Sequence, residues 1–196
     1  MTVVGILLAA GKGRRFDPTG ERNKLLQPWP GTGTVVAGSA AAMLAVLPRV
    51  VAVVGPEGEG VAAELRALGC QVTECAAAAD GMGVSLAHAV KVAADDADGW
   101  LIALADMPEV QSSTIKALAE AIKQGSDIAI PVMQGRRGNP VAFSRLHLAG
   151  LLALHGDQGA RNIVRSHPVL EVEVSDPGIF QDIDTAADLS VQRVSG

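Results

Sequence analysis

The stretch that decides the fold is residues 3–24, VVGILLAAGKGRRFDPTGERNK. It opens with an almost unbroken apolar run at 3–8, which predicts a short strand buried on both faces. The run passes into small residues and glycines at 9–13, where the backbone can approach a ligand and expose its amide N–H groups. Five of the chain's sixteen basic residues cluster here, namely Lys12, Arg14, Arg15, Arg22 and Lys24. A glycine loop beside cations suits a polyphosphate, although such cations can also be ordinary solvated surface.

Two known phosphate loops do not fit this stretch. It lacks the G-x-x-x-x-G-K-[ST] pattern of a P-loop, and Phe16 stands where a dinucleotide fingerprint needs its third glycine. That fingerprint also needs an acid soon after the second strand, and Glu57 comes too late. The candidate ligand that remains is a nucleoside triphosphate held by the loop. The loop residues expected to contact it are Leu8, Ala9, Ala10, Gly11 and Gly13.

Composition narrows the class of protein. A chain of 196 residues with 48% hydrophobic residues suits one globular domain, 1–196. A formal net charge of −5 and 3% aromatic residues argue against nucleic acid as a partner. The apolar runs are too short to span a bilayer, and no signal peptide is evident, so we expect no membrane partner and a cytoplasmic location. Cys70 and Cys75 form no disulfide or zinc pattern and are expected to be buried.

The order of apolar runs and amphipathic segments predicts an α/β fold with a mostly parallel, Rossmann-like sheet. Strands are expected at 3–8, 50–54, 71–74, 100–105, 127–132, 141–143 and, as a half-exposed edge, 169–174. Helices are expected at 34–47, 60–68, 85–94, 146–154 and 186–192, and residues 156–161 are expected to open one more short helix. A further helix, capped by Ser112 or Ser113, is expected to end at Lys123.

Two acidic segments are candidates for a magnesium site. Asp106 follows the most apolar and presumed central strand, at the edge where open parallel sheets bind ligands. Mg²⁺ prefers one or two carboxylates together with phosphate oxygens and water. In an extended segment Asp182 and Asp184 share one face, so either could complete the site. An ordinary helix-capping role is the alternative for each of these acids.

A glycine-flanked turn offers further contacts to a nucleotide or second substrate. Its candidate residues are Gly81, Met82, Gly83 and Ser85. The rival interpretation is a degenerate nucleophile elbow with Ser85 as the nucleophile. That motif needs a strand running directly into the serine, whereas residues 76–80 intervene here, and no histidine stands out as a partner.

Taken together, these motifs resemble the MobA-like nucleotidyltransferases, and within them the molybdenum cofactor cytidylyltransferase branch. The family patterns matched in order are L-x-A-A-G-x-[SG]-x-R-[MF] at 7–16, K-L-L at 24–26, G-M-G-x-S-L at 81–86, D-M-P at 106–108, G-x-P-V-x-F at 138–143, G-D-x-G-A-R at 156–161 and, with two alanines replacing Pro and Glu, D-I-D-T-P-E-D at 182–188.

The resemblance implies a three-layer α/β/α fold with catalytic Arg15 and Lys24 on the triphosphate, and with Asp106 and Asp184 on Mg²⁺. It implies that the 81–85 and 138–140 turns line the nucleotide and acceptor pocket. Ala9 and Ala10 replace the L-A-G-G of guanylyl-transferring relatives, which favours CTP. The segment 17–23 is longer than the family's usual link to the lysine, and Asn139 stands where histidine is common.

The function expected on this basis is Mg²⁺-dependent transfer of CMP from CTP to a phosphorylated acceptor, molybdopterin, with release of pyrophosphate. Three alternatives stay open. They are guanylyl transfer to molybdopterin, cytidylyl transfer to a sugar or polyol phosphate, and a non-catalytic protein that passes the cofactor on. A molybdoenzyme or its maturation factor is a further expected partner.

Overall fold

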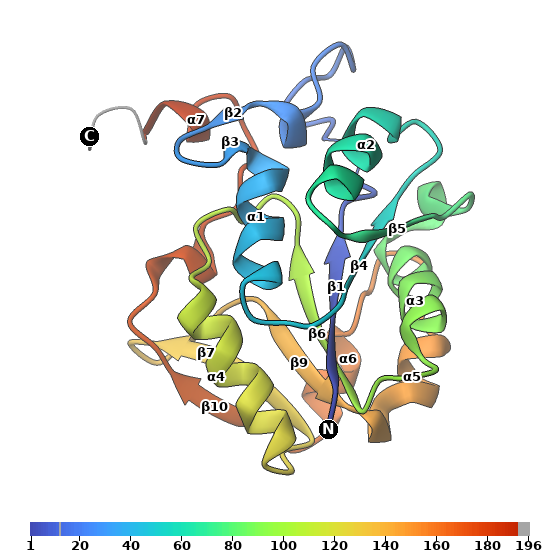
Figure 1. The fold of residues 1–196 in the computed structure, drawn as a ribbon, viewed down its shortest axis with the longest axis vertical. Coiled ribbons are helices and arrows are strands. Elements are labelled where there is room, and N and C mark those ends of the chain that lie inside the picture. Colours follow the sequence, from blue (N-terminus) through green and yellow to red (C-terminus); the bar gives the residue numbers. More distant parts are fainter. Residues whose placement is uncertain (12, 192–196) are drawn as a thin grey trace.

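The protein is built around an eight-stranded mixed sheet, which the computed structural model describes within residues 1–11 and 13–191 (Figure 1). Seven strands lie in the order β10-β7-β9-β6-β1-β4-β5, and β8 pairs with β7. Their bounds are β1 Val3–Leu8, β4 Val50–Val54, β5 Gln71–Glu74, β6 Gly99–Leu104, β7 Ile128–Met133, β8 Arg136–Arg137, β9 Val141–Ser144 and β10 Leu170–Glu173. All pairings are parallel except those made by β8 and β9. The predicted mostly parallel sheet is therefore confirmed.

Both faces of the sheet are buried, because alternate residues of each strand enter different cores. In β6, Leu101 and Ala103 belong to one core, whereas Trp100 and Ile102 belong to the other. Successive side chains of a strand point to opposite faces, so a strand buried on both faces needs an apolar residue at every position. This explains why the strands were visible as continuous apolar runs.

Helices cover each face of the sheet and complete the predicted three layers (Figure 1). The first core takes residues from α1 (Val35–Leu44), α2 (Glu59–Ala67) and α4 (Ser112–Lys123). The second core takes residues from α3 (Met82–Ala93), α5 (Leu148–Leu152) and α6 (Arg161–Ser166). No helix in the described ranges is long and apolar enough to cross a membrane.

Several element boundaries differ from the expected ones. Helix α3 begins at Met82 rather than at Ser85. Neither Ser112 nor Ser113 caps α4. Instead the side chain of Asp176 accepts hydrogen bonds from Gln111 N and Thr114 Oγ1 at 2.9 and 2.6 Å.

Short elements also escaped the sequence analysis. A two-stranded hairpin, β2 (Pro28–Trp29) and β3 (Gly33–Thr34), occupies a segment without strand periodicity. The expected 146–154 helix is split into the 3₁₀ turn η3 (Arg145–His147) and α5. The last helix, α7, covers Asp188–Val191, and the expected end at Gln192 lies outside the described residues.

The carboxyl ends of the parallel strands meet at one edge of the sheet. In Figure 1, β1 and β6 both point toward the top of the view, where the loop after β1, the β2–β3 hairpin and α7 gather. Strand β6 is the fourth of the seven strands in the ordered path, so the residues that follow it lie centrally on this edge. Ligands of open α/β sheets bind at such an edge.

The two cysteines are free and buried, as expected. Burial raises the pKa of the Cys70 thiol to about 11. Because the thiolate is the nucleophile, we expect iodoacetamide at pH 8 to modify Cys70 at least about a hundredfold more slowly in the native protein than in urea. Peptide mass spectrometry over time measures this ratio, and equal native and unfolded rates would contradict the burial.

Candidate active site

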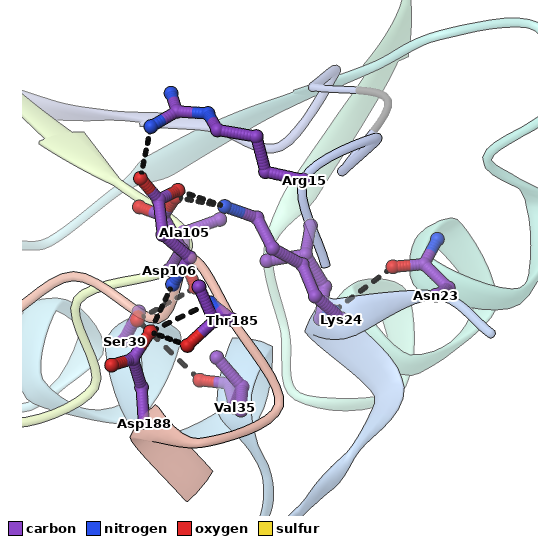
Figure 2. Close-up of polar contacts among 11 residues, drawn as sticks. Arg15, Asn23, Lys24, Val35, Ser39, Ala105, Asp106, Thr185 and Asp188 are labelled. Carbon is purple, nitrogen blue, oxygen red and sulfur yellow. Dashed lines mark hydrogen bonds and ion pairs between the residues drawn. The ribbon is translucent and has the colours of Figure 1, made fainter. Parts of the chain in front are cut away.

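A lysine lies between two carboxylates at the carboxyl edge of the sheet. Lys24 Nζ is 2.5 Å from Asp106 Oδ2 and 3.3 Å from Asp184 Oδ1 (Figure 2). The Lys24 side chain is only 11% exposed. The second carboxylate oxygen of Asp184 contacts Arg15 Nη1 at 2.6 Å, but the Arg15 side chain is 82% exposed. The structure thus brings together the four residues that the resemblance implies for catalysis and metal binding.

Backbone contacts hold the two acidic segments against each other. Asp106 follows β6, and its carbonyl accepts a hydrogen bond from Ile183 N at 2.8 Å. Ile183 is buried in the core, so its neighbours Asp182 and Asp184 both point into the pocket described below. Of these two acids, Asp184 is the one that contacts Lys24.

A third acid fixes the backbone around Asp184. Asp188 Oδ2 accepts hydrogen bonds from Asp184 N, Thr185 N and Thr185 Oγ1 at 3.0, 2.6 and 2.9 Å (Figure 2). Burial opposes ionisation of Asp188, but the bonds from Thr185 and Asp184 outweigh it and hold the pKa of this carboxyl below its usual range. The ionised carboxylate of Asp188 therefore anchors the turn that carries Asp184.

The glycine loop after β1 packs directly on Lys24. Gly13 has a φ of +57°, a conformation that suits glycine, and its carbonyl accepts hydrogen bonds from Phe16 N and Asp17 N. A Cβ on Gly13 would lie 3.5 Å from Lys24 Cγ. The loop and the lysine stem therefore form one continuous surface. Lys12, one of the cations expected here, lies outside the described residues.

The long segment 17–23 is ordered by its own polar groups. Asp17 accepts hydrogen bonds from Thr19 N, Thr19 Oγ1 and Arg22 N at 2.9, 2.7 and 2.8 Å, and these bonds lower the pKa of its carboxyl. Asn23 then caps the 3₁₀ turn η1 (Lys24–Leu26) by accepting a hydrogen bond from Leu25 N. Lys24 therefore reaches Asp106 despite the extra length of this segment.

These residues line a pocket of about 560 Å³. That volume lies in the usual range for small-molecule sites. Every residue predicted to bind the nucleotide lines it except Gly83, and Arg15, Asp106 and Asp184 line it too. Its described lining holds four basic and four acidic residues, namely Arg14, Arg15, Lys24, Arg161, Asp106, Asp157, Asp182 and Asp184.

One wall of the pocket is a close contact between two glycine turns. Gly83 N donates to Gly156 O at 2.7 Å, which explains why Gly83 supports the wall instead of lining the pocket. Gly81 has a φ of +127°, and a Cβ there would lie 2.3 Å from the Gly156 carbonyl carbon. Only glycine fits such an approach. Met82, 47% exposed, lies beside Gly159 on this wall.

Sequence reasoning missed part of the lining. Asp157 and Arg161 line the pocket, yet no role was assigned to them. The G-D-x-G-A-R pattern was the signal that could have identified them. Conversely, the 138–140 turn is absent from the lining of the large pocket. Asn139 and Pro140 line a separate cavity of about 10 Å³, and Gly138 packs on Ile179.

The acidic groups fit a divalent cation that shares phosphate oxygens. Asp106 Oδ1 is buried and has no hydrogen-bond partner among the described residues, so a carboxylate oxygen is left to coordinate a cation. Within the described ranges, no cluster of three or more acidic, His or Cys side chains could hold a metal by itself. Two carboxylates with ligand phosphates match the way proteins bind Mg²⁺.

Comparisons with known proteins identify relatives of this chain in sequence and in fold. The bifunctional protein GlmU of Rhodopseudomonas palustris (strain BisB5) is 31% identical over 153 residues, which are 76% of this chain but only 32% of GlmU. The crystal structure of Rv0371c from Mycobacterium tuberculosis H37Rv matches with a TM-score of 0.83 at 26% identity, over 100% of both chains. A manganese complex of Rv0371c matches with a TM-score of 0.81.

A nucleotidyl transferase from Methanothermobacter thermautotrophicus, at 24% identity, shares the fold with a TM-score of 0.80 over 98% of this chain and 95% of its own. The family described as the MobA-like NTP transferase domain matches residues 5–172. This match contains the glycine loop, Lys24, Asp106 and both glycine turns, and it covers most of the chain. The chain therefore belongs to the MobA-like NTP transferase family and carries a nucleotidyltransferase domain.

Proposed function

We propose that residues 1–196 form one domain that transfers CMP from CTP to a phosphorylated acceptor, molybdopterin, with Mg²⁺ and with release of pyrophosphate. The observation that carries this proposal is the position of Lys24 Nζ between Asp106 and Asp184, beside a glycine loop and within one pocket. One triphosphate in this pocket could therefore reach both a cation for its phosphates, Lys24, and two carboxylates for its metal, Asp106 and Asp184.

The triphosphate binds along the loop after β1 in this proposal. Exposed amide groups of the loop donate to phosphate oxygens, and Gly11 has open space where a side chain would be. The Arg15 pair with Asp184 is largely solvent-exposed and contributes at most about 1 kcal/mol, so Arg15 can turn to a phosphate at low cost. Lys24 exchanges its carboxylate partners for phosphate oxygens in the same way.

Asp106 and Asp184 hold Mg²⁺ in this proposal. The manganese complex of the related Rv0371c supports the use of a divalent ion. A bound Mg²⁺ would neutralise charge on the α-phosphate and on the leaving pyrophosphate.

In the reaction, an oxygen of the acceptor phosphate attacks the α-phosphorus in line. A new phosphorus–oxygen bond forms, the bond from the α-phosphorus to the bridging oxygen breaks, and pyrophosphate leaves with that electron pair. The attacking phosphate is already ionised near pH 7, so no general base is required. Lys24 and Arg15 supply positioning and charge stabilisation.

The choice of CTP rests on local sequence, whereas the choice of molybdopterin rests on the resemblance to the cytidylyltransferase branch of the family. Ala9 and Ala10 lie in the pocket lining, where guanylyl-transferring relatives carry L-A-G-G. Guanylyl transfer, or cytidylyl transfer to a sugar or polyol phosphate, would use the same machinery. A molybdoenzyme or its maturation factor would then receive the product.

The proposal is tested by pyrophosphate release with each of four nucleoside triphosphates and with molybdopterin, a sugar phosphate or a polyol phosphate. We expect release with CTP and molybdopterin, and a loss of at least about a hundredfold in Asp106→Ala or Lys24→Ala, typical of lost electrostatic stabilisation. Asp96→Ala, which changes an exposed acid before the opposite end of β6, is the control and should keep the wild-type rate. Tight molybdopterin binding without pyrophosphate release under any condition would favour a carrier instead.

Replacing Lys24 by methionine should change the affinities for metal and nucleotide in opposite directions. Without nucleotide, we expect Lys24→Met to bind Mn²⁺ about three- to tenfold more tightly, because no ammonium competes for Asp106 and Asp184. With Mg²⁺ present, we expect CTP to bind at least about tenfold more weakly. Titration calorimetry measures both values, with Lys123→Met as a surface control. A fall in both affinities would refute the exchange of partners.

Asp188 and Asp176 form a matched pair, because each accepts bonds from two backbone N–H groups and one threonine hydroxyl. We expect Asp188→Ala to lower Mn²⁺ affinity about tenfold or more, since Asp184 loses its anchor, with about 1 kcal/mol lost in stability. Buried Asp176 lies outside the pocket lining, so Asp176→Ala should cost about 2–4 kcal/mol and leave Mn²⁺ affinity unchanged.

Urea denaturation and Mn²⁺ titration measure the two quantities, and Asp176→Asn replaces the alanine variant if that variant does not fold. Equal Mn²⁺ affinities in the wild type and Asp188→Ala would remove the anchoring role of Asp188.

A further inference from the structure

The G-D-x-G-A-R segment, residues 156–161, brings an arginine to the pocket from the face of the sheet opposite Lys24. Leu25, next to Lys24, and Ile183, next to Asp184, pack in the core with α1 and α4. Ala160, next to Arg161, packs against the other core with α3. Arg161 and Lys24 nevertheless line one pocket. The pocket therefore extends across the sheet edge, with a cation on each side.

The backbone that carries this second cation is held by several contacts. The turn that carries it is joined to α3 through the bond from Gly83 N to Gly156 O. The space at Gly81 is closed by Gly156 and by Asp157 Oδ1, which would lie 2.7 Å from a Cβ there. Two residues after Arg161, Ile163 packs against the second core. Arg161 is thus held by packed backbone on the pocket wall, although its own side chain is exposed.

The charge of Arg161 is not compensated by an ion pair, in contrast to the charges of Lys24 and Arg15. Lys24 and Arg15 both pair with site carboxylates. Among the residues that the structure describes, none forms a hydrogen bond or ion pair with the Arg161 guanidinium. A guanidinium presents paired N–H groups that match phosphate oxygens. The carboxylate of Asp157 on the same wall offsets the charge of Arg161. Recognition of a phosphate on this wall therefore depends on directed hydrogen bonds from the guanidinium.

The geometry of phosphoryl transfer indicates which phosphate belongs on this side. Attacking and leaving oxygens lie roughly in line on opposite sides of the α-phosphorus. If the leaving pyrophosphate lies along the glycine loop and Lys24, the attacking phosphate must approach from the other side of the pocket. Arg161 lines that other side, together with Gly81 and Met82.

We propose that Arg161 binds the phosphate monoester of the acceptor and orients its oxygen toward the α-phosphorus; this inference rests on the proposed nucleotidyl transfer. The ligand chemistry is a phosphate monoester dianion, whatever organic group it carries.

The experiment compares Arg161→Met with Arg165→Met, which changes an exposed arginine one turn later in α6 that lies outside the pocket lining. In steady-state pyrophosphate release, we expect Arg161→Met to raise the KM of the acceptor at least about tenfold and to leave the KM of the triphosphate within about twofold. Arg161→Lys should recover part of the loss, and Arg165→Met should match the wild type.

A binding measurement uses inorganic phosphate as the probe. The enzyme is saturated with Mg²⁺ and the α,β-methylene analogue of CTP, which cannot donate CMP, and phosphate is titrated by ³¹P NMR. We expect phosphate to bind at least about tenfold more weakly to Arg161→Met than to the wild type or Arg165→Met. If Arg161→Met raises the KM of the acceptor but leaves the affinity for inorganic phosphate unchanged, then Arg161 recognises a group other than the phosphate, and the assignment is overturned.

Two other results would overturn it as well. A higher KM for the triphosphate with an unchanged acceptor KM would place Arg161 at the nucleotide, and weaker inhibition by pyrophosphate would place it at the leaving group. Failure of the wild type to release pyrophosphate with any nucleotide would overturn the proposed function itself, and this assignment with it.

Discussion

The site depends on one shared ammonium group. Lys24 contacts the carboxylates of both Asp106 and Asp184 from a position that is 11% exposed, so two like charges at the end of the sheet are held together by the cation between them. In the proposed reaction, a triphosphate would compete for Lys24, and a divalent metal would compete for the two carboxylates. Binding of the triphosphate would then free the carboxylates for the metal, and binding of the metal would free Lys24 for the triphosphate. Under this proposal the binding of metal and the binding of nucleotide support each other, and the support is reciprocal by thermodynamic necessity.

The fold supplies this arrangement through contacts between distant parts of the chain. Strand β6 places Asp106 at the centre of the sheet edge, and the Ile183 N–H bond to its carbonyl brings the segment of Asp184 alongside it. The hydrogen bonds of Asp17 compact the long loop that precedes Lys24. Because these constraints act on the backbone, the three charged side chains can exchange partners without a change of fold.

The sequence predicted the strands well because every buried strand is an apolar run, and Asp106 followed from the position of its strand. The sequence predicted the ends of helices poorly where residues distant in the chain decide them. The start of α4 is held by Asp176, which accepts a hydrogen bond from Gln111 N and lies 65 residues further along the chain, so no local pattern could show it. The same limit applies to the site. Gly83 appeared equivalent to Gly81 in sequence, but its contact with Gly156 turns it away from the lining, and Arg161 reaches the pocket through that same contact.

The charge balance of the pocket bears on its selectivity. Four acidic residues offset the four basic residues of the described lining, within a chain of net charge −5. Nucleic-acid binding draws most of its affinity from the release of counterions by uncompensated cations, and this surface offers few of them. In the proposed function, a metal-bound triphosphate would bring positive charge to the carboxylates and negative charge to Lys24 and Arg15. A balanced site of this kind would favour a small, metal-complexed phosphate ligand over a bare polyanion, because only the former satisfies both sets of charges at once.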